Sequence, residues 1–241
     1  LKVCVNSGAL DGHSPSLAFL PERKLGVVVL ANEDLVNARV TRLANLALSL
    51  LIEARHGVKP PPVPATLPLS PDTLAACAGD YESQSFWASV EVADGQLLAS
   101  VSGQPVKLRA IAPLRFLADS RMHSAQSVEF ERGANGWMAG FTMGAQRFVR
   151  VPEGVPAIPR EWLAYFGSYG PEFIPLVISA QHGHLYAMTE NMVDYRLTPV
   201  NRHVFAMPPG LYDDEHLVIL TDGRGTPRAV NLANMILRRR R

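Results

Sequence analysis

The sequence lacks several features that mark whole classes of protein. It contains only two cysteines, Cys4 and Cys77, which are too few for a disulfide framework and do not match a zinc-binding pattern. We therefore expect two buried thiols. No apolar run reaches the ~18 residues that a membrane-spanning helix requires, and no signal peptide is visible. We expect a soluble protein, and the sequence leaves open whether it is cytoplasmic or periplasmic.

An excess of charge of one sign is also missing. The chain carries 23 Lys and Arg residues against 22 Asp and Glu residues, a formal net charge of +1. Because phosphate binding needs a basic face, this balance argues against a nucleic-acid or membrane-surface protein. The one run of like charge, Arg238–Arg241, is interpreted as a solvated tail, or as a contact to an acidic patch on a partner domain.

The chain does have enough apolar residues to build hydrophobic cores. Hydrophobic residues make up 47% of its 241 positions, which excludes wholesale disorder and suits one large domain or two to three small ones. The chain does not begin with Met, and Leu1–Val5 has the pattern of the middle of a strand. We therefore predict that it is a piece of a longer protein.

Residues 1–57 form the first segment. Two apolar runs, Ser16–Leu20 and Leu25–Leu30, flank a polar turn and predict an antiparallel hairpin. Beyond Asn32–Asp34, which offers a helix start, apolar residues recur at steps of three and four, so we predict a helix that ends at Gly57. Its predicted buried face consists of Val36, Val40, Leu43, Leu46, Ala47, Leu50 and Leu51.

A proline-rich stretch separates this segment from the rest of the chain. Lys59–Pro64 contains four prolines, which lack a backbone donor and fix φ, so it favours neither a helix nor a central strand. We assign residues 58–71 to an extended linker.

The remaining chain contains a weak internal repeat. Gly79-Asp80-Tyr81 is echoed by Gly167-Ser168-Tyr169, and Asp94–Leu97 by His182–Leu185, both at an offset of 88 residues. Further pairs at offsets of 88 to 90 are Val90 with Ile178, Phe148 with Ile236, Phe116 with Phe205, and Val128 with Val218. Each copy contains seven or eight short strands after one helical turn, so we predict two antiparallel barrels, at 72–155 and 156–241.

One stretch near the start resembles a known family. Asn6-Ser7-Gly8 is followed by a turn, by a strand into Leu20-Pro21-Glu22, and by a valine-rich strand that ends at Asn32. This order is similar to the C-terminal end of the penicillin-recognising serine hydrolases, which include class C β-lactamases and D-aminopeptidases. The resemblance covers residues 1–57 and implies the last hairpin and helix of an α/β hydrolase domain. The two barrels then resemble the lipocalin-like domains of D-aminopeptidase-type members.

The resemblance implies a site on the first strand. Ser7 would lie beside the substrate, Gly8 would let the substrate approach the strand, and the backbone N–H of Ala9 would serve as the oxyanion donor. Asn6 departs from the pattern, because the family has Lys or His there and an amide does no acid–base work. No Ser in the chain is followed three residues later by Lys, so the chain by itself lacks the family's nucleophile motif.

Two functions follow as hypotheses. In the first, the chain is the C-terminal part of a serine hydrolase acting on an amide, ester or peptide, and its barrels shape access or assembly. In the second, the tandem barrels form a non-catalytic binding or interaction module. The implied partners are an N-terminal catalytic portion, on the same or a separate chain, and a second copy in a homo-oligomer. No cofactor or metal is expected; His182 and His184 could offer two metal nitrogens, but they fall in a predicted turn.

Overall fold

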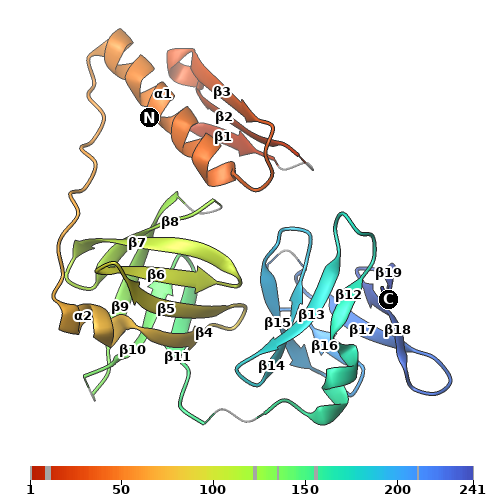
Figure 1. The fold of residues 1–241 in the computed structure, drawn as a ribbon. Helices are drawn as coiled ribbons and strands as arrows, with labels where there is room; N and C mark the ends of the chain where they lie inside the picture. Colours follow the sequence, from red (N-terminus) through yellow and green to blue (C-terminus); the bar gives the residue numbers. More distant parts are fainter. Residues whose placement is uncertain are drawn as a thin grey trace. The chain divides into compact units, whose positions relative to one another are not determined.

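The computed structural model describes residues 2–8, 12–121, 124–134, 136–154, 157–210 and 212–240 (Figure 1). The chain is mainly β and contains a three-stranded sheet and two eight-stranded sheets. By its internal contacts it divides into two compact units. These are Leu1–Leu69 with Val106–Val128, and Ser70–Pro105 with Glu129–Arg241.

The first part of the chain is a three-stranded antiparallel sheet with one helix. Its strands β1 (Cys4–Ser7), β2 (Ser14–Leu20) and β3 (Leu25–Ala31) lie in the order β1-β2-β3, and α1 spans Asn37–His56. The predicted hairpin is confirmed, with Leu17 opposite Val28. Gly57 ends the helix with φ 68°, as expected for a left-handed cap.

The buried face of α1 differs from the predicted one. Ala44 and Leu48 pack against Ala18 and Leu20 of β2, and Val40 is buried on the same side. Other members of the predicted face, Leu43, Leu46 and Leu50, are 55%, 52% and 52% exposed. The helix is apolar on two sides. The side that packs against the small side chains of β2 is formed by residues spaced four apart, Val40, Ala44 and Leu48. Sequence periodicity alone could not select between these two sides.

No helix or strand occurs in residues 57–70, all of which are described. Helix α2 (Pro71–Cys77) follows, and the Ser70 hydroxyl caps it by accepting a hydrogen bond from the Thr73 backbone N–H at 3.2 Å. The predicted helical turn at this point is confirmed.

The next eight strands close into a barrel. In order around it they run β10-β11-β4-β5-β6-β7-β8-β9. Aromatic rings fill its interior, with Phe141 stacked on Phe148 at 4.6 Å and edge-on to Tyr81 at 5.1 Å between ring centroids. The strands are β4 (Gly79–Glu82), β5 (Trp87–Ala93), β6 (Gln96–Val101), β7 (Gln104–Ala112), β8 (Arg115–Asp119), β9 (Ser124–Arg132), β10 (Met138–Met143) and β11 (Gln146–Arg150).

The last eight strands form a second sheet in simple sequence order, preceded by the 3-10 helix η2 (Arg160–Tyr165). A bridge between Tyr169 and Arg239 joins the two ends of this sheet. Arg238 and Arg239, from the arginine run predicted as a tail, are therefore part of the sheet, and Arg241 lies outside the described residues. The strands are β12 (Gly167–Tyr169), β13 (Leu176–Gln181), β14 (His184–Met188), β15 (Asp194–Pro199), β16 (Val204–Ala206), β17 (His216–Thr221), β18 (Pro227–Leu232) and β19 (Met235–Arg238).

The internal repeat is confirmed at its turns. Gly79 and Gly167 begin β4 and β12 with φ of 145° and 139°. The pairs Asp94-Gly95 and His182-Gly183 both make two-residue turns in which both φ angles are positive, the type that joins tightly paired strands. A tyrosine in each copy donates to a carbonyl four residues earlier: Tyr81 to Cys77 at 2.7 Å, and Tyr169 to Tyr165 at 2.6 Å.

The predicted equivalences are wrong by one residue near the ends of the copies. Phe148 is buried but Ile236 is 64% exposed, and Leu237 packs on the second core instead. Val128 is buried, whereas Val218 lies between the buried Leu217 and Ile219. Because strand side chains alternate between faces, an error of one residue moves a side chain to the wrong face.

Candidate functional site

The residues singled out by the sequence lie on strand β1. Asn6 and Ser7 are exposed and pair with Leu17 and Ser16 of β2. Gly8 follows directly, and its carbonyl accepts a hydrogen bond from the Asn37 side chain at 2.6 Å. Ala9 lies outside the described residues. The structure thus brings Asn6, Ser7 and Gly8 together at one edge of the small sheet.

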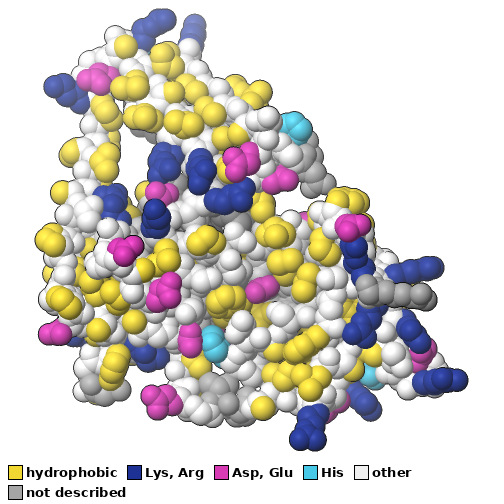
Figure 2. All heavy atoms as spheres, viewed as in Figure 1, with side chains coloured by type: hydrophobic (Ala, Val, Ile, Leu, Met, Phe, Trp, Pro, Cys, Tyr) yellow, Lys and Arg dark blue, Asp and Glu magenta, His cyan; other side chains and the backbone are white. Residues whose placement is uncertain are grey.

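The face of this sheet turned away from α1 is apolar and exposed. Val28 and Leu30 of β3 are 60% and 75% exposed, and Phe19 of β2 is 37% exposed. Leu17 and Pro15 lie opposite Val28 and Leu30 in register. We call these five side chains the outer face; none of them is charged. Figure 2 shows hydrophobic side chains gathered over the part of the chain formed by α1 and β1–β3.

The sequence itself carries a sign of this face. Leu25–Ala31 is apolar or glycine at every position, whereas a strand exposed on one side alternates between apolar and polar residues. A continuous apolar strand is typical of burial on both faces. In the structure α1 covers one face of β3 and the other remains exposed.

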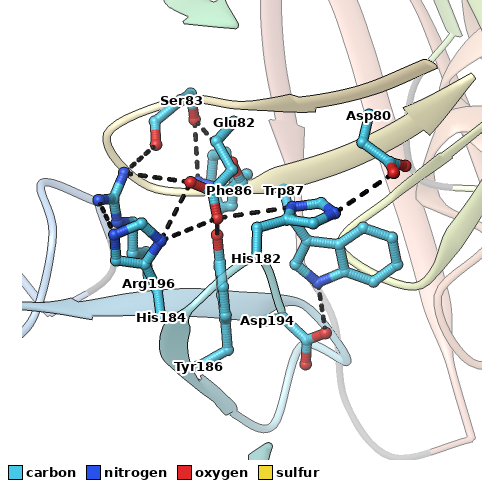
Figure 3. A network of polar contacts seen from close by, with 10 residues as sticks. All are labelled: Asp80, Glu82, Ser83, Phe86, Trp87, His182, His184, Tyr186, Asp194 and Arg196. Carbon is cyan, nitrogen blue, oxygen red and sulfur yellow. Dashed lines mark hydrogen bonds and ion pairs between the residues drawn. The ribbon is translucent and has the colours of Figure 1, made fainter. Parts of the chain in front are cut away.

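A network of polar contacts lies in the second unit, where β4 meets β14 and β15 (Figure 3). We call it the seam. At its centre Glu82, whose side chain is only 12% exposed, accepts a hydrogen bond from the Tyr186 hydroxyl at 2.7 Å. His184 Nδ1 lies 3.1 Å from Glu82 Oε2, and Arg196 Nη1 lies 3.7 Å from the same oxygen. Arg196 Nη2 contacts His184 Nε2 at 2.6 Å.

A second group of contacts extends the seam. Trp87 Nε1 donates to Asp194 Oδ2 at 2.8 Å, and the Ser102 hydroxyl donates to the Asp194 carbonyl at 3.0 Å. The Phe86 and Tyr195 rings lie 5.5 Å apart. Burial raises the pKa of the Tyr186 hydroxyl, and its hydrogen bond to the Glu82 carboxylate adds to this effect. Tyr186 therefore acts as a neutral donor across the physiological range.

We expect Asp194→Asn to stabilise the chain at neutral pH. Burial raises the pKa of the Asp194 carboxyl above its ordinary value, and the hydrogen bond from Trp87 offsets this only in part. The folded state thus binds the proton more tightly than the unfolded state, so the charged carboxylate costs stability above the folded pKa. An amide oxygen still accepts from Trp87 without that cost. Urea unfolding of both proteins should show a gain at pH 7 that shrinks as the pH falls through the carboxyl pKa; an unchanged gain would contradict this explanation.

The described residues hold no group of three or more His, Cys, Asp or Glu side chains arranged to bind a metal ion. His182 is the first residue of a tight turn and His184 begins the strand after it, and both point toward Glu82 (Figure 3). In the described part of the chain, no helix is long and apolar enough to cross a membrane.

Comparisons with known proteins give limited similarity. No family model matches the chain, and no curated protein matches it. Among solved structures, it is similar to a crystal structure of SurE with D-Leu, at 26% identity and a TM-score of 0.33. A crystal structure of SurE matches at 23% identity and a TM-score of 0.31. Each match covers 61% of this chain, and the chain spans only about a third of the SurE chains, 35% and 34%.

These results correct the family resemblance drawn from Asn6–Asn32. No model of the penicillin-recognising serine hydrolases matches, and the matching structures are of SurE rather than of a class C β-lactamase or a D-aminopeptidase. The serine hydrolase function implied by that resemblance is therefore withdrawn. The alternative of a tandem-barrel binding module gains no better support, because buried side chains such as Leu185, Phe205 and Val230 fill the second barrel.

Proposed function

We propose that residues 2–57 serve to complete a larger layered domain together with another polypeptide segment. The observation that carries this proposal is the outer face of the β1–β3 sheet, where Val28 and Leu30 are largely exposed in adjacent positions on one side of a strand. The occupant that fits is an apolar layer that covers this face. A strand from the same segment would pair with a free edge of the sheet.

The energetics of burial support an occupant. Burying a Val or Leu side chain contributes about 1.5–3 kcal/mol. A segment that covers the outer face would therefore stabilise the folded state substantially. A sheet of three strands with a single helix also has little core of its own. Among the described residues, the buried core cluster between the sheet and α1 consists of Ala18, Leu20, Ala44 and Leu48, with four partly buried neighbours.

The chemistry of the surface defines the partner. An uncharged apolar face is typical of the core of a permanent interface, whereas transient interfaces carry more polar groups. Strands β1 and β3 are the two edges of the sheet, and an edge strand accepts an extended segment through main-chain hydrogen bonds. Asn6, Ser7 and Gly8 lie at the β1 edge, and we include them in the contact surface without a catalytic role.

We expect Val28→Lys/Leu30→Lys to remove most of the binding of the dye ANS by the isolated chain. Lysine interrupts the apolar face that the dye needs, while the far-UV circular dichroism of the barrels stays unchanged. The matched control is Val92→Lys/Ile236→Lys, which alters two exposed apolar residues, 45% and 64% exposed, on the barrel strands β5 and β19. This control should bind ANS like the wild type.

Two outcomes would contradict the proposal. If the Val28/Leu30 variant binds ANS as strongly as the wild type, the outer face is not an accessible apolar surface. If sedimentation shows a stable dimer that only this variant dissociates, a second copy of the chain is the occupant.

A further inference from the structure

A pocket lies beside the seam and has no role in the docking of residues 2–57. Its volume is about 500 Å³. The pocket is lined by residues that follow β4, by the strand β11 and by the segment after β11. His182, His184 and Arg196 complete the lining. All of these residues belong to the second unit.

The polar groups of the pocket are mainly cationic. The Arg150 guanidinium is held in place because it donates to the carbonyls of Ala78 at 2.8 Å and Met138 at 2.8 Å. Arg147 is 66% exposed and pairs with Glu131 through one nitrogen at 2.8 Å. Its planar guanidinium carries five N–H donors, so it retains donors for a ligand.

Two further polar residues of the pocket lining are Arg196 and His182. Arg196 is partly buried, with 27% of its side chain exposed, and contacts Glu82 at 3.7 Å. His182 Nδ1 is buried and has no hydrogen-bond partner among the described residues; it lies 3.6 Å from Glu82 Oε1. Among the residues that line the pocket, the three arginines face a single carboxylate, that of Glu82. Two further carboxylates lie outside the lining: Glu131 contacts Arg147, and Asp80 lies 3.7 Å from His182 Nε2.

The rest of the lining is apolar. Val149 on β11 is 53% exposed, and Val151 and Pro152 continue the same wall. Pockets that bind small molecules combine such walls with a few polar groups that fix the ligand's orientation. Guanidinium groups that outnumber the carboxylates of the lining, beside an apolar wall, suit a ligand with one negative charge and a short hydrocarbon body.

We propose that this pocket binds a small organic monocarboxylate. The carboxylate lies against Arg147 and Arg196, and the hydrocarbon body lies along Val149, Val151 and Pro152. Arginine is suited to this contact because its donors match both carboxylate oxygens. The pocket and the outer face share no residue, so each proposal can fail without the other.

The test is a titration of the full chain with hexanoate, followed by calorimetry or by NMR chemical-shift changes. We expect hexanoate to bind, and acetate and 1-hexanol to bind more weakly, because each lacks one of the two features that the pocket recognises. Arg147→Gln should weaken hexanoate binding by about tenfold, the usual effect of losing a hydrogen bond to a charged group. The exposed Arg224→Gln is the control and should leave binding unchanged.

Three results would overturn the proposal. They are the absence of hexanoate binding to the wild type, equal binding by wild type and Arg147→Gln, and tighter binding of inorganic phosphate than of hexanoate. Because Arg147 is largely exposed, its substitution should leave the melting temperature unchanged, and this measurement separates lost binding from lost folding.

Discussion

Replacing Gly79 with alanine is expected to destabilise the chain by about 3–5 kcal/mol. Gly79 has φ of 145°, a conformation that a residue with a Cβ adopts only under strain. A Cβ at this position would also overlap with Arg150 Nη1. The guanidinium would have to move and give up its hydrogen bonds to Ala76, Ala78 and Tyr81.

Gly167→Ala is the matched control within the same chain. Gly167 has nearly the same backbone angle, 139°, but the nearest atom to a Cβ there is Arg239 Nε at 3.6 Å, an ordinary contact distance. This variant should therefore cost only the backbone strain, about 1–3 kcal/mol. Urea unfolding of the two variants measures the difference. Equal losses of unfolding free energy in the two variants would show that displacing Arg150 costs nothing beyond the backbone strain.

Glu82→Ala is expected to cost about 3 kcal/mol, because it leaves partly buried groups of the seam without their acceptor. Tyr186 loses the oxygen to which it donates, and Arg196 loses its carboxylate. Trp87 lies in the same seam, so its fluorescence can follow the unfolding. Glu82 also lines the pocket, and unfolding without a ligand measures its contribution to stability alone.

Glu91→Ala provides the comparison for this substitution. Glu91 is an exposed residue of β5, and its loss should change the unfolding free energy by less than about 0.5 kcal/mol. Glu82→Gln should fall between the two, because its amide oxygen still accepts from Tyr186 but carries no charge for Arg196. If Glu82→Ala were as mild as Glu91→Ala, the seam would contribute little to stability.

The parts of the fold that the sequence predicted correctly depend on local chemistry. Gly95 and Gly183 each supply a left-handed residue at a tight turn, and such turns leave a clear pattern in the sequence. Alternating apolar residues then locate the strands between the turns. The repeat at 88 residues added a second, independent copy of each pattern, which made the barrels predictable.

The seam could not be predicted because it depends on residues distant in sequence. Glu82 and Tyr186 are 104 residues apart, and no local periodicity relates them. The side of α1 that packs was equally undetermined, since both sides are apolar and only the small residues of β2 select one. The family resemblance failed for a related reason: a strand, turn, strand and helix are set by local sequence, whereas a function depends on a complete site.

The seam also gives the two copies of the repeat different roles. Glu82 ends β4 of the first barrel, and the residue at the same place in the second copy is Gly170. Gly170 has φ of 84°, and a Cβ there would lie 3.1 Å from Leu237, so the position cannot readily carry a carboxylate. The first copy therefore supplies the acceptor of the seam, and the second copy supplies the histidine and the tyrosine that contact it. The two copies of the repeat are alike in fold but cannot exchange these roles.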